Sequence, residues 1–414
     1  MADMNYKLLL IIIVLSIVVV YGCESYNNQA VKDQDHIIDQ DADIVDPLKE
    51  QIAQMTIDEK VGQMVMVGLE GYEKDQYSQE MIEKYKVGGF IFFERNIRDA
   101  YQTLTLINSL KEANKENAIP LFIAVDEEGG RVTRMPEEFI KLPASRLIGR
   151  INNEELCFKI GNVIGEELKS LGFNMNFAPV LDIDSNPANP VIGDRSFSSN
   201  EQTVSKLGTA TMKGIQTNVI SAVKHFPGHG DTSTDSHIGL PVVNCDLERL
   251  KSFELVPFAS AVENGADMVM VAHILLPEID EENPATLSKS IITDILRSEM
   301  KFDKVVITDD MTMGAITENF DIGDAAVKSI MAGADIILVC HDHEKQVKVL
   351  EALKQAAVDG IITEDELDMH IYRILKLKQK YNLNDEKIES VDVEKINEKI
   401  RDILGKDFCA LKFL

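Results

Sequence analysis

The chain of 414 residues contains no tryptophan and far fewer basic than acidic side chains. There are 42 lysines and arginines against 69 aspartates and glutamates, which gives a formal net charge of −27. Nucleic-acid binding needs clustered basic side chains to neutralise phosphates, so this balance argues against a nucleic-acid partner. An acidic surface has a simpler use, because it keeps a protein soluble. Without tryptophan, any ring-stacking surface in a binding cleft has to be built from Phe, Tyr or Met.

Cysteine is also scarce, with five residues and no CxxC pair: Cys23, Cys157, Cys245, Cys340 and Cys409. A disulfide framework is not expected in a chain this long with so few cysteines. Buried, unpaired thiols are the expected state of the last four. No GxGxxG opens a predicted helix, and no loop has the carboxylate spacing of a Ca or Mg site. The sequence therefore implies no cofactor and no metal.

One apolar run, at residues 8–20, is long enough to matter for localisation. Its length is typical of a signal-peptide apolar region and short for a membrane-spanning helix. Gly22 and Cys23 follow it and resemble the lipobox of bacterial lipoproteins, although Tyr21 stands where that motif usually has a small residue. We interpret residues 1–22 as a signal peptide and Cys23 as the lipidated residue. An uncleaved anchor helix is the alternative.

Both interpretations place the rest of the chain outside the cytoplasm and attached to the cell membrane. A lipoprotein cysteine carries two or more acyl chains, enough for stable membrane attachment. Residues 23–46 are rich in Asp, Asn and Gln and poor in large apolar residues. This composition predicts a flexible tether between the membrane and a folded domain.

Short apolar, β-branched runs alternate with longer amphipathic stretches over residues 47–382. Most of the apolar runs are continuous, as expected for parallel strands covered on both faces. Eight strands joined by helices predict a (β/α)8 barrel, with an open doubly wound sheet as the alternative. A short helical extension is expected over residues 383–414. The predicted strands are 64–68, 88–93, 121–126, 174–181, 220–225, 268–273, 305–309 and 336–340. The predicted helices are 100–114, 154–171, 203–217, 247–264, 291–299, 324–332, 343–357, 364–381 and 387–404.

Ionisable side chains stand at or just after the ends of five predicted strands. In a (β/α)8 barrel these ends converge on one face, where enzymes of this fold place their catalytic groups. Such groups are costly to bury, so five of them in one chain indicate a functional site more than satisfied core residues. They are Asp126, Asp182, the pair Lys224 and His225, His273 and Asp309.

The loop after the fifth strand carries a second signal. Gly228 and Gly230 bracket His229, so the backbone is expected to turn sharply there. Asp235 and His237 are two residues apart in the polar stretch that follows. A carboxylate beside an imidazole raises its pKa and fixes its tautomer, a pairing suited to proton transfer near neutral pH. A turn cap is the alternative role of Asp235.

A carboxylate at the end of the seventh strand, Asp309, could attack an electrophilic carbon or bind a cation. No set of converging carboxylates favours a hard cation. The composition also allows a zinc site made of His225, His229, His237 and His273, which we keep as an alternative.

Three strings of the chain are similar to motifs of one known family. They are VDEEGGRV at 125–132, KHFPGHGDTSTDSH at 224–237 and ITDDMTM at 307–313. They resemble the β-N-acetylglucosaminidases of glycoside hydrolase family 3, and the similarity runs from about residue 50 to about residue 380. The resemblance implies a (β/α)8 barrel and a two-step retaining mechanism. It also implies a monomer that removes terminal β-linked N-acetylglucosamine, from muropeptides or similar saccharides.

The resemblance assigns the catalytic roles residue by residue. Asp309 matches the nucleophile, His237 the general acid/base and Asp235 the partner of that histidine. Retaining glycosidases usually pair two Asp or Glu residues, so a histidine in the second role departs from the common pattern.

The same resemblance assigns the substrate contacts. Asp126 matches a residue that grips hydroxyls of the terminal sugar. Lys224, His225 and Arg195 match further sugar contacts, and Arg131 matches a residue near that pocket.

Three other functions stay open at this stage. A β-glucosidase of the same family generally needs a second domain to supply a Glu acid/base, for which the remainder after Tyr381 is short. A phosphorylase is possible, since a histidine acid/base repels an incoming phosphate less than a carboxylate does. A sugar-binding lipoprotein with a dead site is disfavoured by the intact Asp235, His237 and Asp309.

Overall fold

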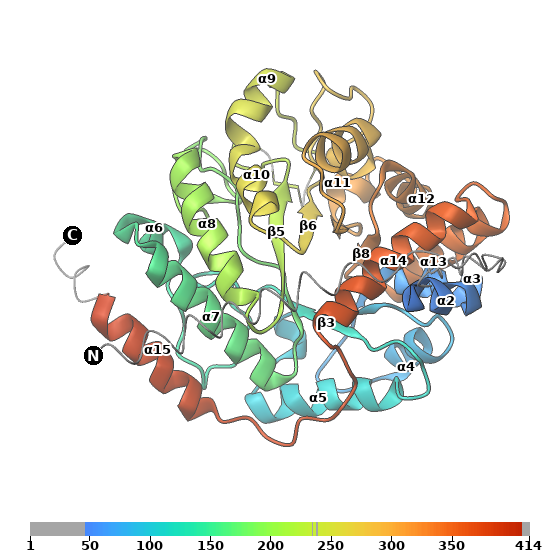
Figure 1. The fold of residues 1–414 in the computed structure, drawn as a ribbon, viewed down its shortest axis with the longest axis horizontal. Coiled ribbons are helices and arrows are strands. Elements are labelled where there is room, and N and C mark those ends of the chain that lie inside the picture. The colour runs from blue at the N-terminus through green and yellow to red at the C-terminus, as the bar shows by residue number, and fades with distance from the viewer. Residues whose placement is uncertain (1–45, 234, 237–238, 408–414) are drawn as a thin grey trace, which may run out of the picture. The chain divides into compact units, whose positions relative to one another are not determined.

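Eight parallel strands close into a barrel in the order β1 to β8, surrounded by helices (Figure 1). The computed structural model describes residues 46–233, 235–236 and 239–407. The predicted signal peptide, Cys23 and His237 lie outside the described residues. The predicted (β/α)8 barrel is confirmed. The strands are β1 Val65–Gly68, β2 Gly89–Phe92, β3 Phe122–Val125, β4 Met175–Asn176, β5 Ile220–Phe226, β6 Met268–Val271, β7 Val305–Asp310 and β8 Ile336–Val339.

Strand β4 is much shorter than the predicted run of 174–181. Pro179 lies in the second half of that run and has no amide hydrogen to donate to a neighbouring strand. Pairing resumes only at an isolated bridge between Val180 and Lys224 of β5. The backbone therefore leaves the hydrogen-bonded sheet just before it reaches the face of the barrel formed by the C-terminal ends of the strands.

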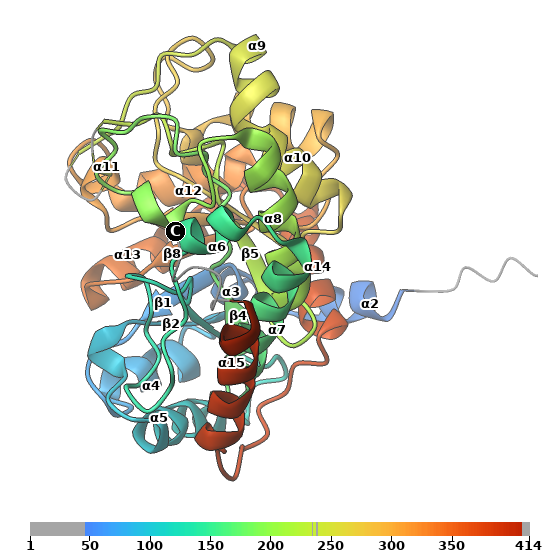
Figure 2. The ribbon, with the colours of Figure 1, turned by 90° about the vertical axis from the view of Figure 1, so that its left-hand side faces the viewer.

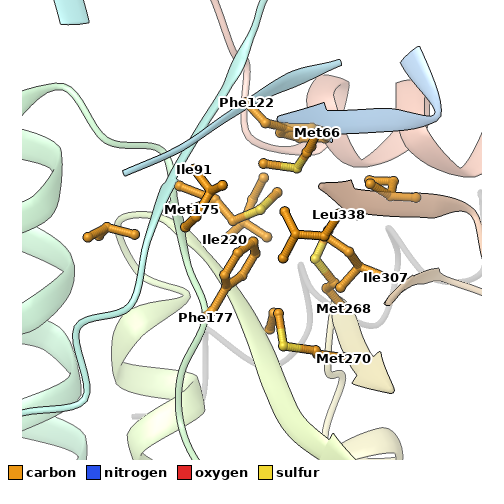
Figure 3. Close-up of a cluster of buried hydrophobic side chains, with 14 of the residues drawn as sticks. Met66, Ile91, Phe122, Met175, Phe177, Ile220, Met268, Met270, Ile307 and Leu338 are labelled. Carbon is orange, nitrogen blue, oxygen red and sulfur yellow. The ribbon is translucent and has the colours of Figure 1, made fainter. Parts of the chain in front are cut away.

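The inside of the barrel is a packed core and not a channel (Figure 3). Every strand contributes a large apolar side chain, and four of these are methionines: Met66, Met175, Met268 and Met270. Methionine is unbranched and flexible, so it fills an irregular interior well. The others labelled in Figure 3 are Ile91, Phe122, Phe177, Ile220, Ile307 and Leu338.

Most of the predicted helices are present with nearly the expected bounds. Helix α7 shows why, because Asn153 caps its first turn and Gly172 ends it with φ +99°. The confirmed helices are α5 Ala100–Ala113, α7 Glu154–Leu171, α8 Glu201–Ile215, α12 Ile322–Ala332, α13 His343–Val358 and α14 Glu364–Lys380.

The predicted helix at 247–264 is broken into three pieces. Helix α9, Leu247–Arg249, leads into a π-helical turn, Leu250–Glu254, before α10, Val256–Glu263. Pro257 at the start of α10 cannot donate a backbone hydrogen bond, and the turn before it is widened accordingly. The stretch at 291–299 is likewise π-helical.

Four helices of seven or eight residues, and the four-residue α11 (Gly314–Thr317), were not among the predicted elements. Two of the four longer helices begin with a capping box, at Thr56 and at Asp75, a signal that the sequence does carry. Their seven or eight residues are too few to show a clear helical period. They are α2 Pro47–Gln54, α3 Ile57–Gln63, α4 Gln76–Glu83 and α6 Ser145–Ile151.

The last helix, α15 (Val393–Asp407), lies along α7 (Figures 1 and 2). It starts later than the predicted 387, because Ile388 exchanges backbone hydrogen bonds with the side chain of Asn108 on α5. Ile400 is fully buried in the contact. In the part of the chain that the structure describes, no helix is long and apolar enough to cross a membrane.

Candidate active site

A cavity of about 320 Å³ opens at the C-terminal ends of the strands. It collects most of the predicted site residues of the described chain, from β5 and β7 and from the segments after β3, β4 and β5; Asp182 and His273, also predicted, do not line it. His237 lies outside the described residues, so its predicted pairing with Asp235 cannot be followed in the structure. The predicted residues that line the cavity are Asp126, Arg131, Arg195, Lys224, His225, Asp235 and Asp309.

A compact group of four charges forms one wall of the cavity. Lys224 is 2 % exposed, and its Nζ lies 2.5 Å from Asp126 Oδ1 and 2.7 Å from Glu128 Oε1. Arg195 donates to both oxygens of Glu128, at 2.8 Å each. Such a bidentate pair fixes both planar groups.

The pKa values of this group favour its charged forms. Burial opposes ionisation of Glu128, but Arg195 and Lys224 outweigh it and hold the pKa of that carboxyl well below its usual range. Burial likewise opposes the charge on Lys224, and Asp126 and Glu128 outweigh it and raise the pKa. The result is a fixed array of donors and acceptors with no net charge, suited to gripping hydroxyl groups.

Sequence reasoning missed Glu128. The signal was present, because Asp126 and Glu128 are two residues apart at a strand end. Residues two apart on an extended segment face the same side.

Beside this group, Asp182 holds two histidines. Its Oδ2 lies 2.6 Å from His225 Nδ1, and its Oδ1 accepts from the backbone N–H of His229 at 2.6 Å. The carboxylate accepts the Nδ1 proton of His225, which leaves Nε2 facing Arg195 Nη2 at 3.3 Å. Burial disfavours ionisation of Asp182, yet His225 outweighs it and the pKa of Asp182 is lowered. Asp182 therefore sets the orientation of His225 from beneath.

Asp309, the penultimate residue of β7, is partly buried and lines the cavity. Burial opposes its ionisation, but His273 and His225 outweigh that effect and lower the pKa of Asp309. Its Oδ1 accepts from the backbone N–H of Asp310 at 2.8 Å. Asp309 is thus an ionised carboxylate at neutral pH, as a nucleophile requires.

The protonation of His273 follows from its partners. Nε2 lies 2.9 Å from the carbonyl oxygen of Asp310, which can only accept. Nδ1 lies 2.6 Å from Thr286 Oγ1, whose own proton goes to the carbonyl of Ala272. Both ring nitrogens act as donors, so the hydrogen bonds assign an imidazolium to His273. This cation stabilises the charge of Asp309.

Asp310 locks the nucleophile in place and was also missed. Its Oδ1 accepts from the backbone N–H groups of Thr312 and Cys340, both at 2.9 Å, and its Oδ2 from Thr312 Oγ1 at 2.6 Å. The end of β7 is thereby tied to the end of β8. Asp310 is a positioning residue for Asp309.

The loop after β5 is anchored close to the cavity. Asn189 donates to the carbonyls of His229 and Gly230, and His229 Nε2 lies 3.2 Å from Ser236 Oγ. A Cβ at Gly230 would lie 1.6 Å from the carbonyl oxygen of Ile183, so only glycine fits there. The loop thus brings Asp235 and Ser236 to the cavity.

Two arginines of the β3 loop behave differently. Arg131, predicted to lie near the pocket, is half exposed and bound to Asp194 at 2.8 Å and to the carbonyl of Val191. Arg134 also lines the cavity, and its buried Nε has no partner among the described residues. Arg134, for which sequence reasoning gave no signal, therefore has a donor to offer to a ligand.

Three of the four histidines of the zinc alternative, His225, His229 and His273, lie in the described chain. No group of three or more His, Cys, Asp or Glu side chains there is placed to hold a metal ion. His225 and His273 are engaged as described above, and His229 Nδ1 contacts Thr232 Oγ1 at 2.9 Å. Cys157, Cys245 and Cys340 are buried free thiols, as expected.

Comparisons with known proteins identify the family of the chain. The model of the glycosyl hydrolase family 3 N-terminal domain matches residues 56–377. β-Hexosaminidase A of Pseudoalteromonas piscicida is 38% identical over 326 residues, which cover 73% of this chain and 54% of that protein. The β-hexosaminidase of Idiomarina loihiensis is 36% identical over 316 residues, or 75% of this chain and 92% of that protein.

Among solved structures, a family 3 β-N-acetylglucosaminidase from Paenibacillus sp. is 40% identical, with a TM-score of 0.80. The match covers 85% of this chain and 69% of that one. The resemblance drawn from the three sequence motifs is confirmed. With a family model over most of the barrel and curated β-hexosaminidases as relatives, the chain belongs to glycosyl hydrolase family 3 and is a glycoside hydrolase.

Proposed function

We propose that the chain is a retaining β-N-acetylhexosaminidase that removes N-acetylglucosamine from the non-reducing ends of saccharides. The observation that carries the proposal is the ionised Asp309 in the same cavity as the Lys224–Asp126–Glu128–Arg195 group. The small volume, about 320 Å³, suits one sugar unit and so an enzyme that acts on chain ends. The β-hexosaminidase relatives support the same activity.

The proposed reaction has two steps. Asp309 attacks the anomeric carbon, and the bond to the leaving oxygen breaks while His237 gives that oxygen its proton. A covalent glycosyl-enzyme on Asp309 results. His237, now neutral, takes a proton from water as the water attacks the anomeric carbon and frees Asp309. Two inversions leave the product with the configuration of the substrate.

The remaining residues bind and orient the sugar. Lys224, Asp126 and Arg195 present donors and acceptors to its hydroxyls, and the buried Nε of Arg134 supplies a further donor. In a site shielded from water such interactions are stronger than in solution, and they need no reorganisation. Asp235 is the proposed partner that keeps His237 ready to donate.

The nucleophile assignment is tested with Asp309→Asn, which keeps the size of the side chain and removes its charge. The rate of 4-nitrophenol release from 4-nitrophenyl N-acetyl-β-D-glucosaminide should fall by at least about 10³-fold, because covalent catalysis is lost. Proton NMR of the wild-type reaction should show the β-anomer as the first product. Near-full activity of the variant, or an α-anomer first, contradicts the proposal.

We further propose that Cys23 is lipidated and that the enzyme acts outside the cytoplasm, as a monomer, on N-acetylglucosamine-containing muropeptides. The apolar run at 8–20 followed by Gly22 and Cys23 supports the anchor. Mass spectrometry of the mature N-terminus decides the lipidation, since an unmodified Cys23 contradicts it. Product analysis with purified muropeptides and with chitobiose decides the substrate.

Phosphorolysis remains the second candidate, because a histidine acid/base tolerates an incoming phosphate. Digestion in phosphate buffer and in phosphate-free buffer separates the two reactions. Hydrolysis gives free N-acetylglucosamine in both buffers, whereas a sugar 1-phosphate would make the enzyme a phosphorylase. The same assay distinguishes a family 3 β-glucosidase, which would prefer an aryl glucoside, and a dead binding protein, which would release nothing.

A further inference from the structure

We propose that Phe93 and His341 form the wall that receives the leaving group, and that this wall takes the flat face of an uncharged ring. This proposal rests on the proposed function, since a leaving group exists only if a glycosidic bond is cleaved in the cavity. Both residues line the cavity, and neither belongs to the charged group that grips the sugar.

The two rings come from neighbouring parts of the closed barrel. Phe93 directly follows β2, and His341 lies just beyond β8, on either side of β1. Their centroids are 5.3 Å apart, with 34° between the planes. The two rings therefore lie next to each other in the lining of the cavity.

Arg95 holds this surface in place. Its guanidinium lies 4.6 Å from the centre of the Phe93 ring, and its Nη2 donates to the carbonyl of Cys340 at 2.8 Å. Its Nε donates to the carbonyl of Leu69 at 3.1 Å and pairs with Glu70 at 3.1 Å. The positions of both flanking loops are therefore fixed relative to each other, as a preformed binding surface requires.

The order of strands leaves one side of the cavity for the leaving group. The hydroxyl-gripping residues lie after β3, after β4 and on β5, and the nucleophile Asp309 is the penultimate residue of β7. Asp309 attacks from the face of the sugar opposite the leaving oxygen, so the leaving group occupies a part of the cavity that neither Asp309 nor the hydroxyl-gripping residues fill. In the closed barrel β8, β1 and β2 lie between β7 and β3. Phe93, after β2, and His341, after β8, line the cavity on that side.

The chemistry of the wall selects its ligand. The chain has no tryptophan, and Phe177, the other phenylalanine at the cavity, is only 1 % exposed and belongs to the barrel core. The charge of Arg95 is compensated by Glu70. The wall thus offers ring faces and no unpaired charge, which suits the C–H face of a sugar ring or an aryl group.

Two substrates separate this wall from the site of the retained sugar. N,N′-diacetylchitobiose has a ring as its leaving group, whereas N-acetyl-β-D-glucosaminyl fluoride loses only fluoride. In His341→Ala and in Phe93→Ala, kcat/KM for the disaccharide should fall about five- to tenfold, the size of one stacking contact. For the fluoride it should stay within about twofold of wild type. His341→Phe, which keeps a flat ring, should retain most of the disaccharide activity.

Tyr77→Ala is the matched control. Tyr77 and His343 form another ring pair on the same side of the barrel, 4.5 Å apart, and neither lines the cavity. That variant should leave both substrates unchanged.

Equal losses on both substrates would place the rings against the retained sugar and overturn the proposal, as would no loss on either. If Phe93→Ala fails to fold, the half-exposed His341 gives the answer alone. Wild-type protein that cleaves neither substrate overturns the proposed function itself, a result distinct from either of these.

Discussion

At the scale of single residues, the site depends on buried charges that are matched in pairs. Glu128 accepts from both Lys224 and Arg195, and its side chain is 3 % exposed. A buried ion pair contributes little net stability, but removing one partner is strongly destabilising because the remaining charge is left buried without compensation. Substituting Glu128 therefore tests whether Lys224 and Arg195 depend on it for their positions.

Glu128→Ala should lower the free energy of unfolding by about 3–5 kcal/mol, since two cations lose their common acceptor. It should also lower kcat/KM by at least about 10²-fold, because Lys224 and Arg195 move. Urea denaturation and the aryl glycoside assay measure the two effects. Arg131→Ala is the control, as its pair with Asp194 is half exposed on both sides, and should cost no more than about 1 kcal/mol. Equal effects of the two variants would contradict the argument.

The imidazolium assigned to His273 gives a prediction for pH dependence. Burial opposes the charge on Asp309, and His273 is the largest effect that offsets it and lowers the pKa of Asp309. The ionised form is active, so activity is lost as pH falls through that pKa. His273→Gln keeps hydrogen bonding without the charge and should move the acid limb of kcat/KM upward by about one pH unit. An unmoved limb would mean that His273 is neutral.

Sequence alone could identify Asp126, Lys224 and Asp309, because each interrupts an otherwise apolar strand at its end. It could not identify Arg134, whose position in a loop gives no period or spacing to interpret. The buried Nε of Arg134 becomes informative only once the loop is folded. The predicted role of His237 stays a prediction.

At the scale of elements, the buried side chain of Glu127 holds the loop after β3 in its conformation. Glu127 accepts from the backbone N–H groups of Gly129 and Arg134, at 3.2 and 2.8 Å, and fixes the turn between Asp126 and Arg134. Burial raises the pKa of Glu127 to about 7. Burial, with the charge of Glu127 nearby, raises the pKa of Glu167 on α7 well above its usual range.

Two acids with raised pKa values make stability fall with rising pH. The unfolded carboxyls lose their protons near pH 4.5, whereas the folded Glu127 keeps its proton up to about pH 7. Between these values the folded state binds more protons, so the free energy of unfolding falls by up to about 1.4 kcal/mol per pH unit for each group. Glu167→Gln should flatten this slope in urea titrations at pH 5 to 8. An unchanged slope would contradict the raised pKa of Glu167.

The regular elements could be predicted closely because the barrel strands are continuous apolar runs and the long helices carry caps and periods. The differences between the predicted and the observed bounds have local causes that sequence patterns do not reveal. Pro179 ends β4 early, Pro257 splits the helix after β5, and Asn108 holds Ile388 out of α15. In each case one or two hydrogen bonds are gained or lost at a single position.

At the scale of the whole molecule, the barrel unites residues that are far apart in the chain. Asp126 and Asp309 are separated by 183 positions and share one cavity. The barrel gives the fold, and the family membership rests on the family model and the relatives, whereas membrane attachment at Cys23 and an extracytoplasmic location stay proposals. The natural substrate depends on the loops around the cavity, which the barrel supports but does not specify.

Three methionines inside the barrel, Met66, Met175 and Met268, can report how often the core opens. They are fully buried, so peroxide reaches their sulfur atoms only when strands separate, whereas Met270 lines the cavity and can be reached from there. Peptide mass spectrometry after timed exposure should show Met331, 44 % exposed on α12, oxidised first and the three buried methionines later, together, at the rate of global unfolding. Bound N-acetylglucosamine should slow oxidation of the three buried methionines and leave Met331 unchanged. In an oxidising environment, the buried methionines would therefore be oxidised no faster than the barrel opens.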